Sequence, residues 1–167
     1  MKKYVAILAL LAAATVAQAS ANETPISGSV SSKCSIFTNT SGVYAQPNPY
    51  TLSTDSADGG VDPVIRIDVS VADYYLANIS YPTSFSQSPT LTDSITFTGD
   101  VTLGDVSDTG MAGYDNNKTT FNNTHQYDLT VAGTTYFIIS SEATYGDNKS
   151  LPAGNYTAVV QSECIAK

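Results

Sequence analysis

The alternation of apolar and polar residues is the feature that most constrains the fold of this chain. In the stretch SITFTGDVTLG, the apolar residues and one glycine take every second position: Ile95, Phe97, Gly99, Val101 and Leu103. A period of two residues is that of a half-buried β-strand, whereas a helix repeats about every 3.6 residues. The segment VIRIDVSV, residues 64–71, alternates in the same way. Both segments therefore predict strands that turn one face to a core.

Other segments rich in Thr, Val, Ile and Tyr also predict strands: 26–37, 74–81, 127–131, 135–141 and 155–165. A weaker candidate at 43–53 is interrupted by prolines, which favours a sheet edge. The segments 127–131 and 135–141 are expected to form a hairpin through Ala132-Gly133. Seven or eight short strands with almost no helical period predict an all-β fold, an antiparallel β-sandwich in a single domain.

Two long polar stretches separate the strands, at residues 53–63 and 105–125. The second has about twenty residues without apolar alternation, so we expect either a functional loop or a loop that contains a short turn of helix. His125, near its end, is expected to be a solvated loop residue.

The N-terminus predicts export from the cell. Lys2 and Lys3 precede an apolar run, residues 4–16, and small residues follow in the patterns Ala-Gln-Ala and Ala-Ser-Ala. The run is too short to cross a hydrocarbon core roughly 30 Å thick. Residues 1–21 are therefore predicted to be a signal peptide of bacterial type, which sends the chain to the periplasm or beyond. No later stretch approaches the length of a membrane-spanning helix.

The mature chain is acidic, which excludes some partners. Without the two lysines of the signal, five of the seven Lys and Arg remain against fifteen Asp and Glu, a net charge of about −10. Such a chain repels phosphate backbones and anionic lipid headgroups. Binding to nucleic acid or to a membrane surface is therefore not expected.

The chain has two cysteines, Cys34 and Cys164, near the two ends of the mature sequence. An even count in an exported protein favours a disulfide over free thiols. A bridge that closes so long a loop stabilises the fold by about 4 to 5 kcal/mol in the chain-entropy model. One histidine and the lack of a CxxC pair leave nothing from which to build a zinc site or a redox motif.

No catalytic constellation stands out in the sequence, so we expect neither an enzyme nor a cofactor. There is one histidine, no GxSxG motif and no pair of carboxylates that differs from ordinary turn residues. Asp55, Asp58 and Asp62 surround two glycines and could coordinate calcium. Oxygen ligands at this spacing are also common in turns, and the EF-hand pattern is missing, so no metal site is predicted.

The segments ISGSVSSKCSI, LPAGNYTAVVQ and ISYPTSFSQSPTLTDSI of the mature chain together resemble parts of the chaperone-usher pilins, nearest the alpha and archaic branches. ISGSVSSKCSI resembles their short alternating extension, which leads into a first strand with a cysteine. LPAGNYTAVVQ resembles their last strand, and ISYPTSFSQSPTLTDSI resembles the middle of such subunits. The likeness concerns the layout of most of the mature chain, and specific similarity of sequence is confined to its two ends.

This resemblance implies an immunoglobulin-like sandwich, residues 34–167, whose missing final strand comes from a neighbouring subunit. Residues 22–33 would be the extension that supplies it. The donor side chains would be Thr24, Ile26, Gly28 and Val30. The acceptor groove would be lined by Tyr156, Ala158 and Val160.

The function that the resemblance implies is that of a structural subunit of a surface fimbria. Subunits would join by donor-strand exchange with identical or related pilins, helped by a periplasmic chaperone and an outer-membrane usher. The fibre would serve adhesion or biofilm formation at the cell surface.

The chain departs from the better-known pilins at two points. Those pilins pair the first-strand cysteine with one on the next strand, whereas a Cys34–Cys164 bridge would join the first strand to the last, at the mouth of the groove. The extension is also short, and little of it would remain to donate if the first strand began at Ile26.

A second function remains open. The alternation in ISGSV could belong to an ordinary first strand of a self-complete sandwich. The protein would then be a secreted binding module for carbohydrate or a host surface, using loops such as 105–125. Tyr74, Tyr75 and Tyr81 could form a sugar-binding platform, although sandwich strands use tyrosine routinely.

Overall fold

The computed structural model describes residues 27, 33–147 and 149–167 of the chain. The predicted signal peptide, residues 1–21, lies outside the described residues. So does the predicted extension, residues 22–33, except for Ser27 and Lys33. No helix in the described part combines the length and the apolar character that crossing a membrane requires.

The chain divides into two units, residues 1–30 and 31–167, and the strands and helices of the described residues all belong to the second. The strands are β1 (Cys34–Thr40), β2 (Ala45–Asn48), β3 (Thr51–Ser53), β4 (Val64–Val69), β5 (Tyr75–Ser80), β6 (Phe85–Gln87), β7 (Ile95–Val106), β8 (Thr119–Phe121), β9 (Thr124–Leu129), β10 (Gly133–Tyr145), β11 (Thr157–Ala158) and β12 (Gln161–Ala166). Single turns of helix lie at η1 (Ser56–Asp58), η2 (Thr109–Met111) and α1 (Tyr114–Asn117).

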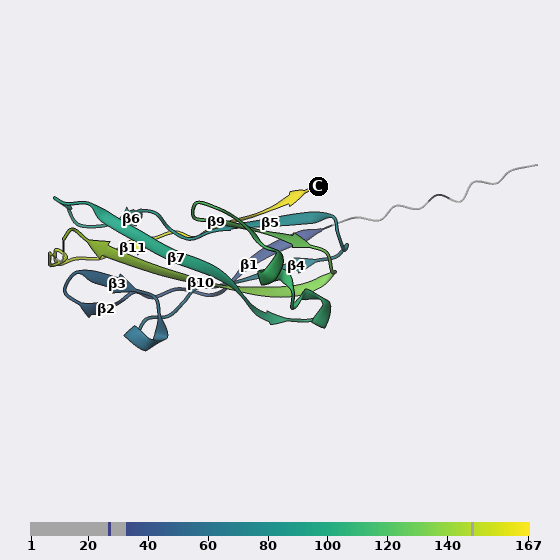
Figure 1. The fold of residues 1–167 in the computed structure, drawn as a ribbon, viewed down its shortest axis with the longest axis horizontal. Helices are drawn as coiled ribbons and strands as arrows, with labels where there is room; N and C mark the ends of the chain where they lie inside the picture. The colour runs from purple at the N-terminus through teal and green to yellow at the C-terminus, as the bar shows by residue number, and fades with distance from the viewer. Residues whose placement is uncertain (1–26, 28–32, 148) are drawn as a thin grey trace, which may run out of the picture. The chain divides into compact units, whose positions relative to one another are not determined.

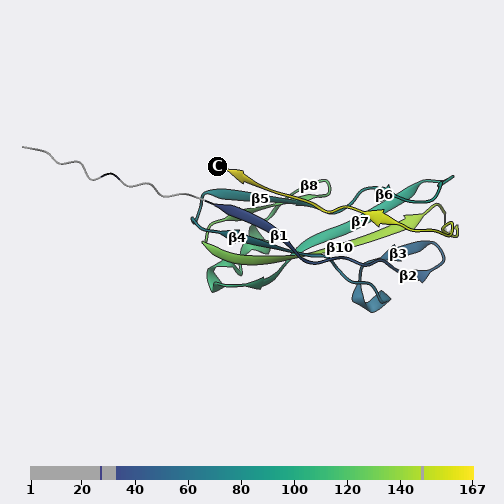
Figure 2. The ribbon, with the colours of Figure 1, turned by 180° about the vertical axis from the view of Figure 1, so that it is seen from behind.

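The strands form two main antiparallel sheets, which confirms the prediction of an all-β sandwich (Figure 1). The first sheet has the order β1–β4–β10–β3–β2, and β7 pairs with β10 as well. The second has the order β12–β5–β9–β8, and β11 and β6 form a separate two-stranded ribbon. Figure 2 shows the face on which β1 and the C-terminal segment, drawn in yellow, lie.

The core lies between the two sheets and is built from alternate residues of their central strands. Its largest fully buried side chains are Tyr127, Phe137, Ile67, Ile79, Met111, Leu129, Ile139 and Val101. The rings of Tyr127 on β9 and Phe137 on β10 lie 4.6 Å apart and join the two sheets. Each fully buried apolar side chain of this size stabilises the fold by about 1.5–3 kcal/mol relative to exposure.

The alternation that predicted a strand at 94–104 is confirmed by β7. Its odd-numbered residues from Ile95 to Leu103 are buried or half-buried, and the even-numbered ones from Thr96 to Thr102 are exposed. Gly99 is one of these inward positions, and it is a glycine because there is no space for a side chain. A Cβ at Gly99 would lie 2.5 Å from the carbonyl oxygen of Ser140 and 2.8 Å from the ring of Tyr81.

The predicted hairpin between 127–131 and 135–141 is wrong. β9 pairs with β5 and β8 in the second sheet, while β10 pairs with β4, β3 and β7 in the first. The link through Ala132-Gly133 therefore crosses from one sheet to the other. Tyr127 on β9 and Phe137 on β10 are fully buried and contact each other across the core, as side chains from two packed sheets can and paired strands of one sheet cannot.

The long polar stretch at 105–125 contains η2, α1 and β8. Of the two expectations for it, a loop that contains a short turn of helix is therefore confirmed. It also contributes to the core, because Met111 and Tyr114 are buried. The proline-interrupted segment at 43–53 forms β2 and β3, and β2 ends its sheet, as predicted for an edge. The C-terminal segment 155–165 is divided into β11 and β12 by Val159 and Val160.

Candidate functional site

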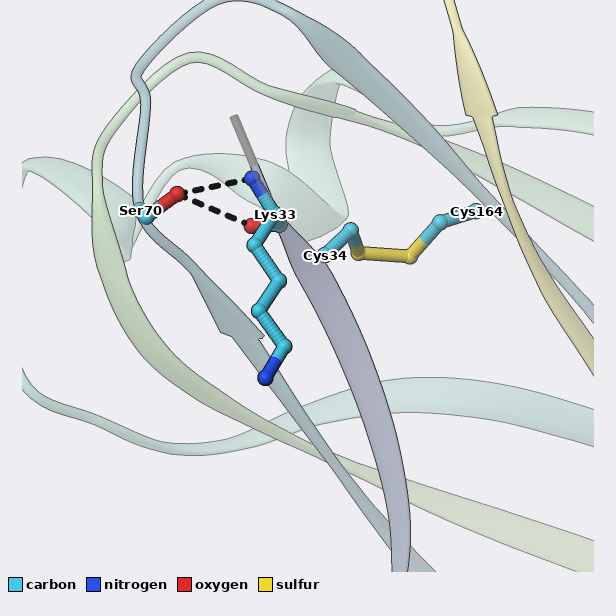
Figure 3. Close-up of a disulfide and its surroundings, with 4 residues drawn as sticks. All are labelled: Lys33, Cys34, Ser70 and Cys164. Carbon is cyan, nitrogen blue, oxygen red and sulfur yellow. Dashed lines mark hydrogen bonds between the residues drawn. A yellow bond between two sulfur atoms is a disulfide. The ribbon is translucent and has the colours of Figure 1, made fainter. Parts of the chain in front are cut away.

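Two strands from opposite ends of the chain form neighbouring sheet edges. β1 ends the first sheet and pairs with β4, and β12 ends the second sheet and pairs with β5. Cys34, the first residue of β1, forms a disulfide with Cys164 of β12, with 6.3 Å between their Cα atoms (Figure 3). The predicted disulfide is thus confirmed, and it joins the two sheets at one end of these edges.

An open groove lies beyond the disulfide, between the chain from Thr38 to Tyr44 and the chain from Tyr156 to Val160. Its volume is about 550 Å³. The other residues of its lining are Thr54, Pro63, Pro82 and Ser141. Every lining residue is uncharged, so the groove suits a neutral segment better than an acidic or basic one.

The three residues predicted to line an acceptor groove all lie in this lining. Tyr156, Ala158 and Val160 alternate along the chain and are half-buried, while the intervening Thr157 and Val159 are exposed. Val159 exposes 55% of its surface, which is unusual for a valine next to a packed sheet. The structure therefore brings these predicted residues together on one wall.

The wall formed by residues 156–160 is also where strand pairing is interrupted. Thr157 and Ala158 pair with β6, and pairing with β5 begins at Gln161. Val159 and Val160 belong to neither ladder. An extended segment placed next to them could form hydrogen bonds with backbone N–H and C=O groups that neither ladder uses.

The rings of Tyr44 and Tyr156 form an aromatic floor in the groove, and they pack near Phe85, which is not part of the lining. Phe85 contacts Phe97 at 4.8 Å and Tyr156 at 5.0 Å between ring centroids, and Tyr44 lies 6.1 Å from Phe85. Burial raises the pKa of Tyr44 and of Tyr156 above that of a free phenol. Both therefore stay neutral at physiological pH, which keeps the floor uncharged.

Hydrogen bonds fix the two tyrosines of this floor. The hydroxyls of Tyr44 and Ser141 lie 2.7 Å apart, and the Tyr156 hydroxyl donates to the Pro152 carbonyl at 2.7 Å. Each phenol thus has its polar end satisfied and its ring free for apolar contact.

The predicted donor residues Thr24, Ile26, Gly28 and Val30 all lie outside the described residues. The first described strand, β1, begins at Cys34 and not at Ile26. Lys33, just before it, is held to Ser70 at the end of β4 (Figure 3). The Ser70 amide donates to the Lys33 carbonyl at 3.0 Å, and the Lys33 amide donates to the Ser70 hydroxyl at 2.8 Å.

Nothing in the sequence pointed to the opposite wall, Thr38 to Tyr44, or to the aromatic cluster around Phe85. The apolar alternation of the first strand ends at Phe37 and is followed by Thr, Asn, Ser and Gly, which give no sign of a binding surface. Phe85 is far from Tyr156 in the sequence, and only the fold brings its ring against those of Phe97 and Tyr156.

The prediction that His125 is a solvated loop residue is wrong. It lies on β9 with 5% of its surface exposed, and its Nε2 is 3.5 Å from Asp100 Oδ1. Burial lowers its pKa, Lys118 lowers it further, and the carboxylates of Asp100 and Asp115 oppose the shift. The imidazole is therefore kept neutral at physiological pH.

Lys118 and Tyr127 complete this second cluster. The Lys118 ammonium donates to the Val101 carbonyl at 2.6 Å and lies 3.2 Å from Asp100 Oδ1. The Tyr127 hydroxyl donates to the same Val101 carbonyl at 2.6 Å. These contacts attach the segment 105–125 to β7 and β9, so the cluster has a clear structural role.

The other candidate residues are dispersed or used structurally. Asp55 caps η1 by accepting from the Ala57 amide, and Asp62 accepts from the Thr54 hydroxyl. No group of three or more His, Cys, Asp or Glu residues that could hold a metal ion occurs in the described part. Tyr74 and Tyr75 contact each other before and at the start of β5, whereas Tyr81 follows its far end, so the three rings cannot form one platform.

Comparison of the chain with protein-family models, curated proteins and solved structures finds no match.

Proposed function

We propose that this protein is a structural subunit of a surface fibre in which each copy inserts an N-terminal strand into the groove of the next copy. The donor would be residues 22–33, and the acceptor would be the groove lined by Tyr156, Ala158 and Val160. The observation that carries this proposal is the open, uncharged groove between the end of β1 and the segment that contains β11, two strands with one neighbour each. Addition of a β-strand satisfies such edges, with backbone hydrogen bonds for affinity and side chains for specificity.

The position of the groove favours insertion by another copy. The chain enters β1 at the disulfide, where Lys33 is paired with Ser70, while the groove begins at Thr38. To fill its own groove, the segment before Lys33 would have to reverse direction and pass the bridge. A donor from a second copy can approach the groove from its open side.

Exchange of this kind builds a fibre and not a closed dimer. The surface that donates and the surface that accepts are different parts of each copy, so the contact is head-to-tail and leaves a free donor and a free groove at the two ends. In this proposal the chain is exported through the periplasm, where a chaperone protects the groove and an outer-membrane usher assembles the subunits. The fibre then serves adhesion or biofilm formation.

Co-expression of two complementary variants tests this proposal. One has an impaired donor, Ile26→Asp with Val30→Asp, and the other has a blocked groove, Ala158→Trp. We expect the unaltered chain to form a series of detergent-resistant polymers, each variant alone to stay monomeric, and the pair to form heterodimers without longer polymers. Native mass and denaturing electrophoresis would measure all three results.

Two further variants serve as matched controls. Ser29→Asp adds a charge to the donor at the alternate position, and Gln161→Trp adds a ring at an exposed residue outside the groove lining. Both should still form polymers. If the unaltered chain were a stable monomer, the proposal would be wrong, and a self-contained binding module would become the better explanation.

A further inference from the structure

We propose that the Cys34–Cys164 disulfide closes one end of the groove and limits the inserted strand to about five residues, Ile26 to Val30 of a second copy. This inference rests on the proposed function and adds the length and position of the segment that is inserted. It also divides the four predicted donor side chains into two groups. Ile26, Gly28 and Val30 would enter the groove, whereas Thr24 would lie outside it.

The spacing between β1 and β12 at the disulfide leaves no room for another strand between them. The Cα atoms of Cys34 and Cys164 are 6.3 Å apart. A strand that pairs on both sides needs neighbours two strand spacings apart, about 9.5 Å. β1 and β12 are therefore too close at this point for a strand to pass between them.

Backbone pairing holds each cysteine of the bridge in its own sheet. Cys34 pairs with Val69 on β4, and Cys164 pairs with Ala77 on β5. Lys33 extends the first ladder through its bonds to Ser70. The bridge thus joins two strands, neither of which can leave its own sheet at this point without loss of backbone hydrogen bonds.

The lining of the groove begins several residues away from the bridge on both chain segments. Thr38 comes four residues after Cys34, and Val160 comes four residues before Cys164. The wall from Tyr156 to Val160 has five residues, which extend over about 17 Å at the usual rise of a strand. An inserted strand that stops before the bridge therefore has about the same length.

A strand of five residues turns three alternate side chains toward the groove. In the predicted donor, Ile26 to Val30 is the window of this length that contains both large apolar side chains. Residues 24–32 of the sequence are all uncharged, like the lining of the groove. Gly28 would be the middle one of the three inward positions, between the two large side chains.

Hydrogen exchange of single amides tests this inference on the full mature chain with an impaired donor, Ile26→Asp with Val30→Asp. The probe is a synthetic peptide of residues 22–32. At a free peptide concentration about a hundred times its Kd, exchange should slow by about a hundredfold at amides that the peptide covers. We expect this slowing at Val159, at Val160 and at those amides from Thr38 to Tyr44 that point toward the groove. The amides from Cys34 to Ile36 and from Ser162 to Ile165 should exchange at an unchanged rate.

Peptide variants give a second readout. A peptide with Thr24→Asn should bind within about twofold of the original, whereas one with Val30→Asn should bind at least about tenfold more weakly, because a buried valine is replaced by an amide. Equal slowing on both sides of the disulfide, or equal losses for the two peptides, would overturn the inference and leave the proposed function intact. A peptide that does not bind at all would overturn both.

Discussion

At the scale of single residues, burial decides what the chemistry of a side chain is. His125 follows a run of Asn and Thr in the sequence, yet its ring lies 6.1 Å from that of Tyr81 and close to Asp100. Its Nδ1 lies 3.3 Å from the Thr120 hydroxyl, so both ring nitrogens have polar neighbours. A histidine in this setting is a sensitive probe of acid stability.

We expect the protein to lose stability as the pH falls through about 6.5, the ordinary pKa of histidine. The folded state lowers the pKa of His125, so the unfolded chain takes up a proton first, and the contribution of this group is fully present only above that pH. In His125→Gln this part of the loss should be absent. Urea unfolding above and below pH 6.5 would measure it, and an equal loss in both proteins would contradict the prediction.

At the scale of elements, the last segment of the chain serves two sheets in turn. β11 pairs with β6, β12 pairs with β5, and the residues between them form a wall of the groove. The disulfide then connects β12 to β1, over a separation of 130 residues in the sequence. It therefore links the first and last described strands of the sandwich.

Removal of this bridge should destabilise the fold strongly. In Cys34→Ala with Cys164→Ala, the unfolded chain regains the freedom of a loop of more than a hundred residues, which costs about 4 to 5 kcal/mol of stability in the chain-entropy model. The free energy of unfolding in urea would measure this loss. Reductant should weaken the unaltered protein by a similar amount and leave the variant unchanged; an effect of reductant on the variant would show that another process is involved.

At the scale of the whole molecule, charge opposes association while the groove favours it. The chain carries a formal net charge of −8 at pH 7, but the groove lining and residues 24–32 are uncharged. Two copies therefore repel each other at long range, although the segment and the groove that would meet have no charge.

If the proposed exchange occurs, salt should speed polymer formation. The Debye length falls from roughly 30 Å at 0.01 M salt to roughly 8 Å at 0.15 M, which screens the repulsion between approaching copies. The resistance of completed polymers to detergent should change little, because no ion pair is expected at the inserted strand. Light scattering would follow the rate, and slower assembly at the higher salt concentration would contradict this account.

The sequence by itself determined the class of fold and several local features. Alternation at 64–71 and 94–104 predicted strands, because the pleat of a strand turns successive side chains to opposite faces. The count of cysteines predicted the bridge, and the resemblance to pilins named Tyr156, Ala158 and Val160, which lie together in the lining of the groove.

The tertiary structure alone decided which strands became neighbours. The two strands around Ala132-Gly133 joined different sheets because their large inward side chains, among them Tyr127 and Phe137, pack across the core. His125 became buried because it lies on β9, where the fold brings Tyr81, Asp100 and Thr120 next to its ring. The groove depends on distant segments, Thr38 to Tyr44 and Tyr156 to Val160, and no local pattern encodes the distance between two sheet edges.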